Sequence, residues 1–153
     1  MGIENRNKYW LSIMKIEYDE MPPSLLRGNS RGTWRQKLKP KQVWEDKTLI
    51  RIREQNFKPI QGKAELQYTA YYCGTAIDND NLVIGMKCAL DMFTREGLIE
   101  DDGPDYIGIL PVIYHRVPHR NQVRLVMEIK QKDEEIKRLE REWDKIEKRE
   151  CAK

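Results

Sequence analysis

The sequence predicts a single α+β domain with the element order β-α-β-α-β-β, in which helices pack on a mixed sheet and an amphipathic helix follows at the C-terminal end. Residues 62–73 alternate apolar and polar side chains, which is typical of a strand. Residues 81–96 repeat apolar side chains at helical spacing, and Gly97 follows where a left-handed stop residue belongs. The chain has 153 residues, which is the length of one domain.

Two further elements are predicted before the alternating strand. Residues 9–18 form a strand with apolar side chains on both faces, so we expect burial on both sides. Pro40 suits the first position of a helix, and the apolar residues after it predict a helix over residues 40–56.

The last part of the chain is predicted as a hairpin followed by a helix. Residues 106–114 and 123–129 form the two strands of the hairpin, joined by a basic turn. The helix covers residues 133–150, so the chain divides into a domain over 1–130 and a helical extension over 131–153. The helix carries an apolar stripe at heptad spacing, formed by Ile136, Leu139, Trp143 and Ile146.

Composition excludes several classes of protein. Charged residues make up 35% of the chain, the mean hydropathy is -0.79, and no apolar run approaches the roughly 20 residues of a membrane span. The N-terminus also lacks the apolar region of a signal peptide, so we expect a cytoplasmic protein with no membrane partner. The cysteines Cys73, Cys88 and Cys151 are odd in number and lack CxxC spacing, which argues against disulfides and zinc.

Charge is unevenly distributed along the chain. Residues 27–53 hold nine Lys or Arg against two acids, a local balance of +7, whereas residues 78–105 hold eight acids against two bases, a balance of -6. Basic side chains neutralise nucleic-acid phosphates, and acidic clusters attract cations. The two segments together favour a metal-dependent protein that acts on DNA.

The acidic segment is the strongest candidate site. Asp78 and Asp80 follow the alternating strand and lie two apart, so in an extended segment they face the same side. Asp101 and Asp102 follow the predicted helix, and a return loop is expected to bring a third carboxylate beside the first two. Carboxylates gathered in this way repel unless a cation sits between them, and oxygen ligands without nearby His or Cys suit Mg²⁺.

This segment resembles the signature of the RusA-type Holliday junction resolvases, crossover junction endodeoxyribonucleases common in phages and prophages. The resemblance is strong over residues 78–106, fair over the flanking strands, and absent from about the last twenty residues. Relative to the founding member, Val-Ile-Gly is inserted between Leu82 and Met86. The matching elements are, in order, Asp78, Asp80, Asn81, Leu82, Lys87, Asp91, Gly97, Asp101 and Asp102.

The resemblance implies an endonuclease that uses Mg²⁺, with Mn²⁺ as a substitute. Such an enzyme resolves Holliday junctions and other branched DNA by paired nicks, acts as a homodimer, and works in the bacterial cytoplasm. Carried over to this chain, the metal-binding carboxylates are Asp78, Asp80 and Asp102, with Asp101 as a possible contributor, and Lys87 is the functional lysine. The candidate DNA-binding residues are Arg27, Arg31, Trp34, Arg35, Lys37, Lys39, Arg116 and Arg120.

Several alternatives stay open at this point. The same fold is compatible with a catalytically inactive DNA-binding or architectural protein. Asp80 or Asn81 is also a suitable helix cap, Lys87 suits an ordinary surface position, and Trp34 suits the core as well as a DNA contact. The C-terminal helix either docks on its own domain or pairs with a partner subunit.

Two metal sites of other kinds are excluded. A calcium loop starting at Asp78 would need Gly and Glu where Val83 and Ala89 stand. His115 and His119 are four apart, but Pro118 between them argues against the helix that would place both on one zinc ion.

Overall fold

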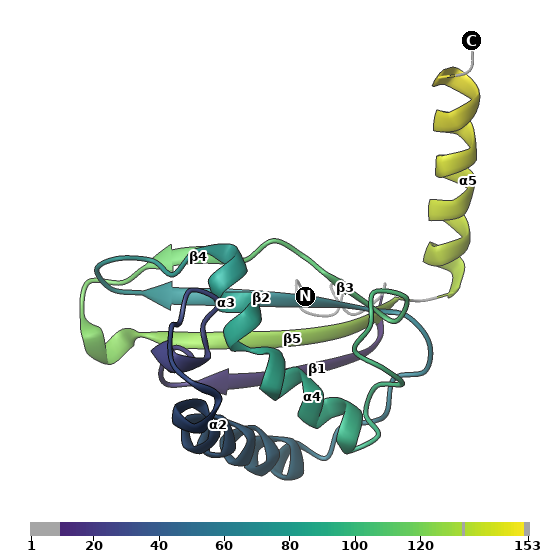
Figure 1. Ribbon diagram of the computed structural model, residues 1–153. Helices are drawn as coiled ribbons and strands as arrows, with labels where there is room; N and C mark the ends of the chain where they lie inside the picture. The colour runs from purple at the N-terminus through teal and green to yellow at the C-terminus, as the bar shows by residue number, and fades with distance from the viewer. Residues whose placement is uncertain (1–9, 133, 152–153) are drawn as a thin grey trace.

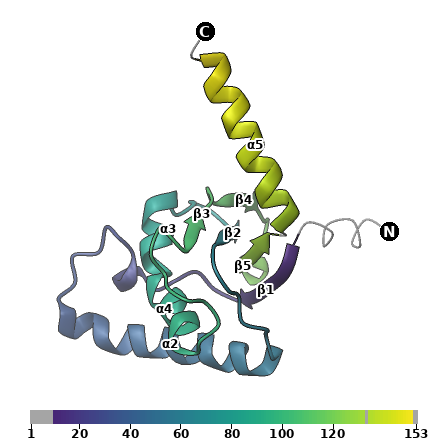
Figure 2. The same ribbon diagram turned by 90° about the vertical axis from the view of Figure 1, so that its right-hand side faces the viewer.

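The computed structural model describes residues 10–132 and 134–151 and has the predicted α+β class. A mixed five-stranded sheet carries helices on one face (Figures 1 and 2). The strands are β1 (Trp10–Tyr18), β2 (Ala64–Tyr72), β3 (Ile107–Ile109), β4 (Ile113–Arg116) and β5 (Arg124–Lys132).

The last strand, β5, lies in the middle of the sheet. It pairs in antiparallel fashion with β1 on one side and with β2 on the other, whereas β3 and β4 both run parallel to β2 along its far edge. The predicted hairpin is therefore wrong, because β2 separates β4 from β5. The predicted strand 106–114 is also divided at Pro111, which has no N–H to donate to a ladder.

Burial alternates along the described part of β1 and most of β2, and β5 follows the same pattern except at Val126, which is also buried. The side chains that point towards the helices form the core, and they include Met14, Ile16, Tyr18, Leu66, Tyr68, Leu125, Met127 and Ile129. Lys15 and Glu17 point the other way and are exposed, so β1 is buried on one face and not on both as expected. Helices cover a single face of this sheet, and we call the opposite face the open face (Figure 2).

The first long helix, α2 (Trp34–Gln55), begins earlier than the predicted start at Pro40. Thr33 and Gln36 form a capping box at its N-terminus, with Gln36 N donating to Thr33 Oγ1 over 3.3 Å and Thr33 N donating to Gln36 Oε1 over 2.9 Å. This reciprocal pair satisfies two backbone donors, and Pro40 then lies inside the helix. The helix ends at Asn56, which adopts a left-handed conformation with φ 52°.

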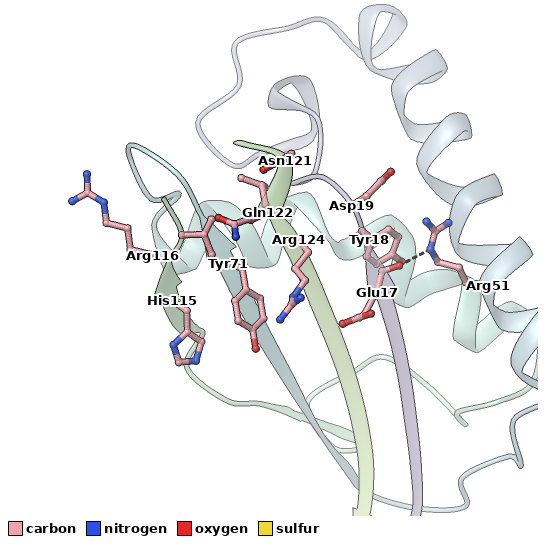
Figure 3. A pocket seen from close by; sticks show the side chains of 12 residues that line it. Glu17, Tyr18, Asp19, Arg51, Tyr71, His115, Arg116, Asn121, Gln122 and Arg124 are labelled. Atoms are coloured by element: carbon pink, nitrogen blue, oxygen red, sulfur yellow. Dashed lines mark hydrogen bonds between the residues drawn. The ribbon is translucent and has the colours of Figure 1, made fainter. Parts of the chain in front are cut away.

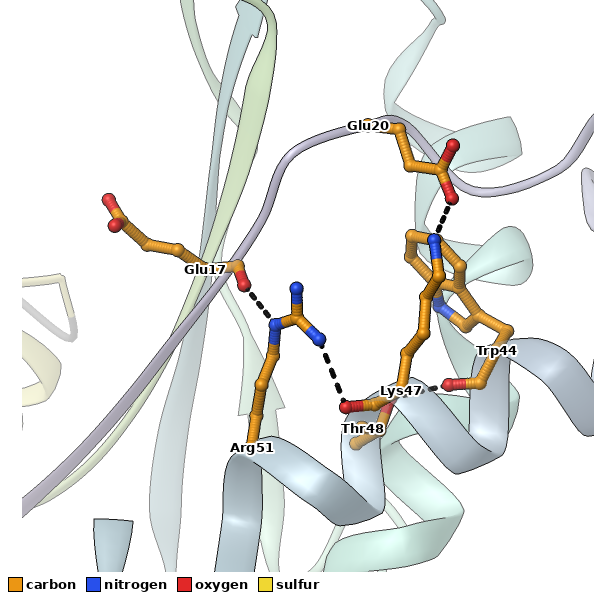
Figure 4. A network of polar contacts seen from close by, with 6 residues as sticks. All are labelled: Glu17, Glu20, Trp44, Lys47, Thr48 and Arg51. Carbon is orange, nitrogen blue, oxygen red and sulfur yellow. Dashed lines mark hydrogen bonds and ion pairs between the residues drawn. The ribbon is translucent and has the colours of Figure 1, made fainter. Parts of the chain in front are cut away.

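Polar contacts join α2 to β1 (Figure 4). Lys47 pairs with Glu20, and Arg51 Nε donates to the Glu17 carbonyl over 2.5 Å. Beneath them the Tyr18 and Trp44 rings stack with centroids 4.5 Å apart. Lys47 and Arg51 thus have structural partners, although they lie in the basic segment of the sequence.

The predicted helix 81–96 is divided into α3 (Asn79–Gly85) and α4 (Lys87–Arg95). Met86 joins them with φ -95° and ψ 1°, which is not helical. At Gly85 a Cβ would come within 3.1 Å of Pro22 Cγ, so the absence of a side chain lets the loop after β1 pack against α3. Gly97 adopts φ 73°, which confirms it as the left-handed stop residue.

Three further helical elements complete the described chain: η1 (Ser24–Leu26), η2 (Arg120–Gln122) and α5 (Glu134–Cys151). Figures 1 and 2 show α5 standing away from the sheet. Trp143 and Ile146 on it are 65% and 46% exposed, while Tyr9, Asp133 and the side chains of Ile136 and Leu139 lie outside the described part. None of the described helices is long and apolar enough to cross a membrane.

Candidate functional site

Asp78 and Asp80 lie at the start of α3, just beyond the end of β2. Asp78 is the N-cap of α3, since its Oδ1 accepts a hydrogen bond from Asn81 N over 2.9 Å. Its Oδ2 accepts from the Asn81 side-chain amide over 3.0 Å. Asp80 lies in the first turn of the helix and is exposed, as is Asp78. Capping therefore belongs to Asp78, and not to Asp80 or Asn81, the two expected candidates.

The two asparagines of the Asp-Asn-Asp-Asn run hold this segment in place. The backbone N–H and the side-chain amide of Asn81 both donate hydrogen bonds to the Asp78 carboxylate. The Asn79 side-chain oxygen accepts a hydrogen bond from the backbone N–H of Val112 over 2.8 Å. Val112 directly precedes β4, so this hydrogen bond joins the start of α3 to the edge of the sheet. The two amides thus fix the backbone from which Asp78 and Asp80 project.

Tyr114 on β4 borders the acid pair and was not among the predicted site residues. Its hydroxyl donates to the carbonyl of Ile77 over 2.7 Å. Burial raises the pKa of Tyr114, and the negative charges of Asp78 and Asp80 raise it further. The sequence contained no signal for this neighbour, because only the pairing of β4 with β2 brings it to the acid pair.

The beginning of the basic segment packs against the same place. A Cβ on Gly28 would lie 2.9 Å from Asn81 Oδ1 and 2.7 Å from Ile84 Cδ1, so the loop packs closely against these two side chains of α3. Arg27 Nε donates to the Pro22 carbonyl over 3.0 Å, and burial lowers the pKa of the Arg27 guanidinium. Arg27 and Tyr114 both line a pocket of about 210 Å³. Arg27 and Tyr114 thus share one pocket, and the Tyr114 hydroxyl contacts the Ile77 carbonyl, one residue before Asp78.

Asp101 and Asp102 lie elsewhere. They belong to the loop between α4 and β3, which enters the sheet where Tyr106 O accepts a hydrogen bond from Ala64 N, at the first residue of β2. The segment that carries Asp78 follows the last residue of β2, and Figure 1 shows the two segments at opposite ends of that strand. Across residues 10–132 and 134–151, no three His, Cys, Asp or Glu side chains gather in a group that could hold a metal ion. The return loop thus does not bring the expected third carboxylate to the pair.

Lys87 is the first residue of α4 and is exposed. It lies beyond the break at Met86, so its direction is set by α4 rather than by the helix that carries Asp80. The sequence argument placed Lys87 on the same face as the acid pair of one continuous helix. With two helices, that argument from helical spacing no longer applies.

The candidate DNA-binding residues form two groups. Trp34 is 68% exposed, which excludes a place in the core, and the Arg35 guanidinium lies 5.3 Å from its ring centroid. Lys37 and Lys39 follow within the first two turns of α2, and Arg31 lies in the loop just before the helix. Arg116 and Arg120 are exposed at the end of β4 and in η2, close to the end of the sheet where β2 finishes.

The donor set fits Mg²⁺ in its chemistry. This ion takes one or two carboxylates and completes its shell with waters and substrate phosphates, so Asp78 and Asp80 are sufficient protein ligands. To bind a metal through both oxygens, Asp78 would exchange its contacts with Asn81. Both carboxylates are exposed, and a phosphate could reach them from solvent.

The chain matches no protein-family model, and no curated protein matches it. The functional interpretation of the site therefore depends on its residues, their geometry and the resemblance of the motif.

Proposed function

We propose that this protein is a Mg²⁺-dependent endodeoxyribonuclease that cuts Holliday junctions and other branched DNA. In this proposal it is a RusA-type resolvase that acts as a homodimer, because paired nicks in two strands require two active sites. Its place of action is the bacterial cytoplasm, where its DNA substrate lies.

One observation supports this proposal above the others. Asp78 and Asp80 project from a backbone that two asparagines fix at the end of a buried strand, and the basic loop at Gly28 packs against Asn81 and Ile84 of the same helix. A rigid pair of carboxylates beside a cationic segment suits a phosphodiester, since the acids load a cation and the bases neutralise phosphates.

Each residue has a separate role in the proposal. Asp78 and Asp80 would hold Mg²⁺, which supplies an activated water and stabilises charge on the phosphodiester. Lys87 would neutralise the phosphate, and the basic residues from Arg27 to Lys39 would bind the DNA backbone.

Cleavage of a synthetic four-way junction, with and without Mg²⁺, tests the proposal. Asp78→Asn and Asp80→Asn should each abolish cutting and leave junction binding in metal-free buffer unchanged. Asp46→Asn is a matched control, since it removes one exposed carboxylate from α2. Cutting by either site variant at the rate of the control would contradict the assignment of the metal ligands.

Asp102 needs its own test, because its role comes from the resemblance and the structure leaves it at the other end of β2. Loss of cutting in Asp102→Asn would support the role that the resemblance implies. Cutting at the unaltered rate would restrict the metal ligands to Asp78 and Asp80.

A DNA-binding or architectural protein without catalysis is the second candidate. It is favoured by one observation: both oxygens of Asp78 already accept hydrogen bonds from Asn81. Such a protein would bind junctions in a salt-dependent manner, and Mg²⁺ would not raise its melting temperature. A clear stabilisation by Mg²⁺ that disappears in Asp80→Asn would favour the nuclease.

A further inference from the structure

A cleft of about 790 Å³ lies on the open face of the sheet, at the end where β2 finishes (Figure 3). The ends of β1, β2, β4 and β5 line it, together with Arg51 of α2 and the turn that contains η2. Tyr71 forms part of its wall, and the neighbouring residue Tyr72 faces the opposite side, towards Tyr114. The cleft and the acid pair thus occupy opposite faces of the same end of the sheet.

Three side chains on adjacent strands form a row across the wall of this cleft. Tyr71 is paired with His115 on β4 and with Arg124 on β5. The Tyr71 and His115 rings stack with centroids 5.1 Å apart, and the Arg124 guanidinium carbon lies 4.0 Å from the Tyr71 ring centroid. In Figure 3 the polar ends of all three point the same way, off the sheet.

The lining of the cleft offers cationic groups that no described acid neutralises. Arg116 and Arg124 are exposed, and neither forms an ion pair within the described residues. The acids of the cleft, Glu17 and Asp19, stand on the side of β1, where Arg51 of α2 also lines the cleft and donates to the Glu17 carbonyl. Towards β2, β4 and η2 the lining residues include Arg116 and Arg124 and no acid, so an anion is attracted to that half.

The packing of Tyr71 also restricts the kind of ligand. His115 and Arg124 lie on either side of its ring, so no base can stack on Tyr71. The cleft is open and polar, unlike the mostly apolar pockets that bury small molecules. A polyanionic backbone that passes over the row would bind to arginine, imidazole and phenol groups without base stacking.

We propose that this cleft binds the phosphodiester backbone of a second DNA arm, on the face opposite to the acid pair. The inference rests on the proposed action on branched DNA and specifies how such a substrate is recognised. A linear duplex held beside Asp78 continues along one face of the protein, whereas the diverging arms of a junction reach both faces. Arg124 is the residue that makes the protein prefer the junction.

The test measures DNA binding in metal-free buffer, so that cutting plays no part. A four-way junction and a linear duplex of matched sequence are titrated with the unaltered protein and with Arg124→Gln, Arg124→Lys and Lys63→Gln. Lys63 is the matched control, because it is an exposed cation directly before Ala64, at the other end of the strand that carries Tyr71.

Arg124→Gln should weaken junction binding by about tenfold and reduce the salt slope by about one unit. Duplex binding should change by less than about twofold, as should junction binding by Lys63→Gln. Arg124→Lys keeps the charge and should retain more junction affinity than Arg124→Gln. Equal unfolding temperatures of the variants would confirm that packing around Tyr71 is preserved. If only Arg124→Gln unfolds at a lower temperature, the junction affinity of Arg124→Lys relative to the unaltered protein decides the test.

Three results would overturn the proposal. The first is an equal effect of Arg124→Gln and Lys63→Gln on junction binding. The second is an equal loss of junction and duplex affinity in Arg124→Gln. The third combines two observations: thymidine monophosphate stabilises the unaltered protein but not Arg124→Gln, and the two proteins bind the junction with equal affinity. That result would assign the cleft to a free nucleotide. None of these results depends on cleavage, so failure of the nuclease proposal is recognised separately, by the Mg²⁺-dependent cutting assay.

Discussion

Asp78 has a structural role that can be separated from the proposed chemistry. Its carboxylate caps α3 through Asn81 N, and asparagine caps helices about as well as aspartate. Asp78→Asn should therefore change the free energy of unfolding by less than about 0.5 kcal/mol, whereas Asp78→Ala should cost about 1 kcal/mol. Urea unfolding of the two variants measures this difference. Equal destabilisation by Asn and Ala would mean that the carboxylate charge itself stabilises the fold.

Tyr18 makes stability depend on pH in the alkaline range. Its hydroxyl lies 2.7 Å from Thr48 Oγ1 and acts as the donor, because the Thr48 hydroxyl donates to the Trp44 carbonyl. Burial raises the pKa of Tyr18 well above its usual range, although the positive charge of Arg51 acts in the opposite direction. Tyr68 is fully buried, and burial raises its pKa in the same way.

A raised tyrosine pKa means that the folded state favours the neutral phenol. The stabilisation is complete below the unfolded pKa of about 10 and is lost as pH rises through the interval up to the folded value. The free energy of unfolding should therefore fall above about pH 10, by at most about 1.4 kcal/mol per pH unit for each tyrosine. Urea unfolding between about pH 8 and pH 11 measures this slope. Tyr18→Phe should reduce the slope, and an unchanged slope would exclude Tyr18 as its source.

At the scale of elements, the basic residues of α2 and of the loop before it include two groups with different surroundings. Arg31 and Arg35 lie around the start of the helix without ion pairs in the described part of the chain, whereas Lys47 and Arg51 are bound to the end of β1 and the loop after it. Arg31→Ala with Arg35→Ala should weaken DNA binding and lower the salt slope by about one unit for each lost phosphate contact. Fluorescence anisotropy over a range of salt concentrations measures both quantities.

Arg51→Ala is the control for this prediction. It should lower the melting temperature, since Arg51 holds the Glu17 carbonyl and lies 5.3 Å from the Tyr18 ring centroid. Its effect on the salt slope should be smaller than that of the double variant Arg31→Ala with Arg35→Ala. A salt slope that is unaltered in the double variant would show that Arg31 and Arg35 do not contact phosphate.

At the scale of the whole molecule, the exposed stripe of α5 bears on the proposed homodimer. Trp143 and Ile146 are exposed on a helix that stands away from the sheet, so α5 does not complete the core of its own domain. If α5 pairs with a second copy, a chain that ends at Lys132 should sediment as a monomer and keep its free energy of unfolding. Trp143→Glu in the full chain should have the same effect.

The opposite pattern would indicate docking on the same chain. In that case the shortened chain would lose stability and keep its oligomeric state. Glu142 and Glu147 lie one helical turn from Ile146 and Trp143, and their repulsion between two copies is screened by salt. A dimer formed through α5 should therefore become tighter as salt concentration rises, in contrast to DNA binding, which weakens.

The sequence could predict only part of the candidate site. Asp78 and Asp80 were found because their spacing and their place after a strand are local properties. Tyr114 could not be found, because it reaches the acid pair through the pairing of β4 with β2. The row of side chains in the cleft on the open face could not be found either, since Tyr71, His115 and Arg124 come from three separate strands.

The sequence by itself determined the elements whose signals are local: the alternating strand β2, the left-handed stop at Gly97, and the existence of α5. Only the tertiary structure decided the insertion of β5 between β1 and β2, the break at Met86, and the separation of Asp102 from Asp78. The physical reason is that periodicity and capping act within about one or two turns of chain. Strand order and loop position instead depend on which apolar faces are buried together, and residues far apart in the sequence determine that choice.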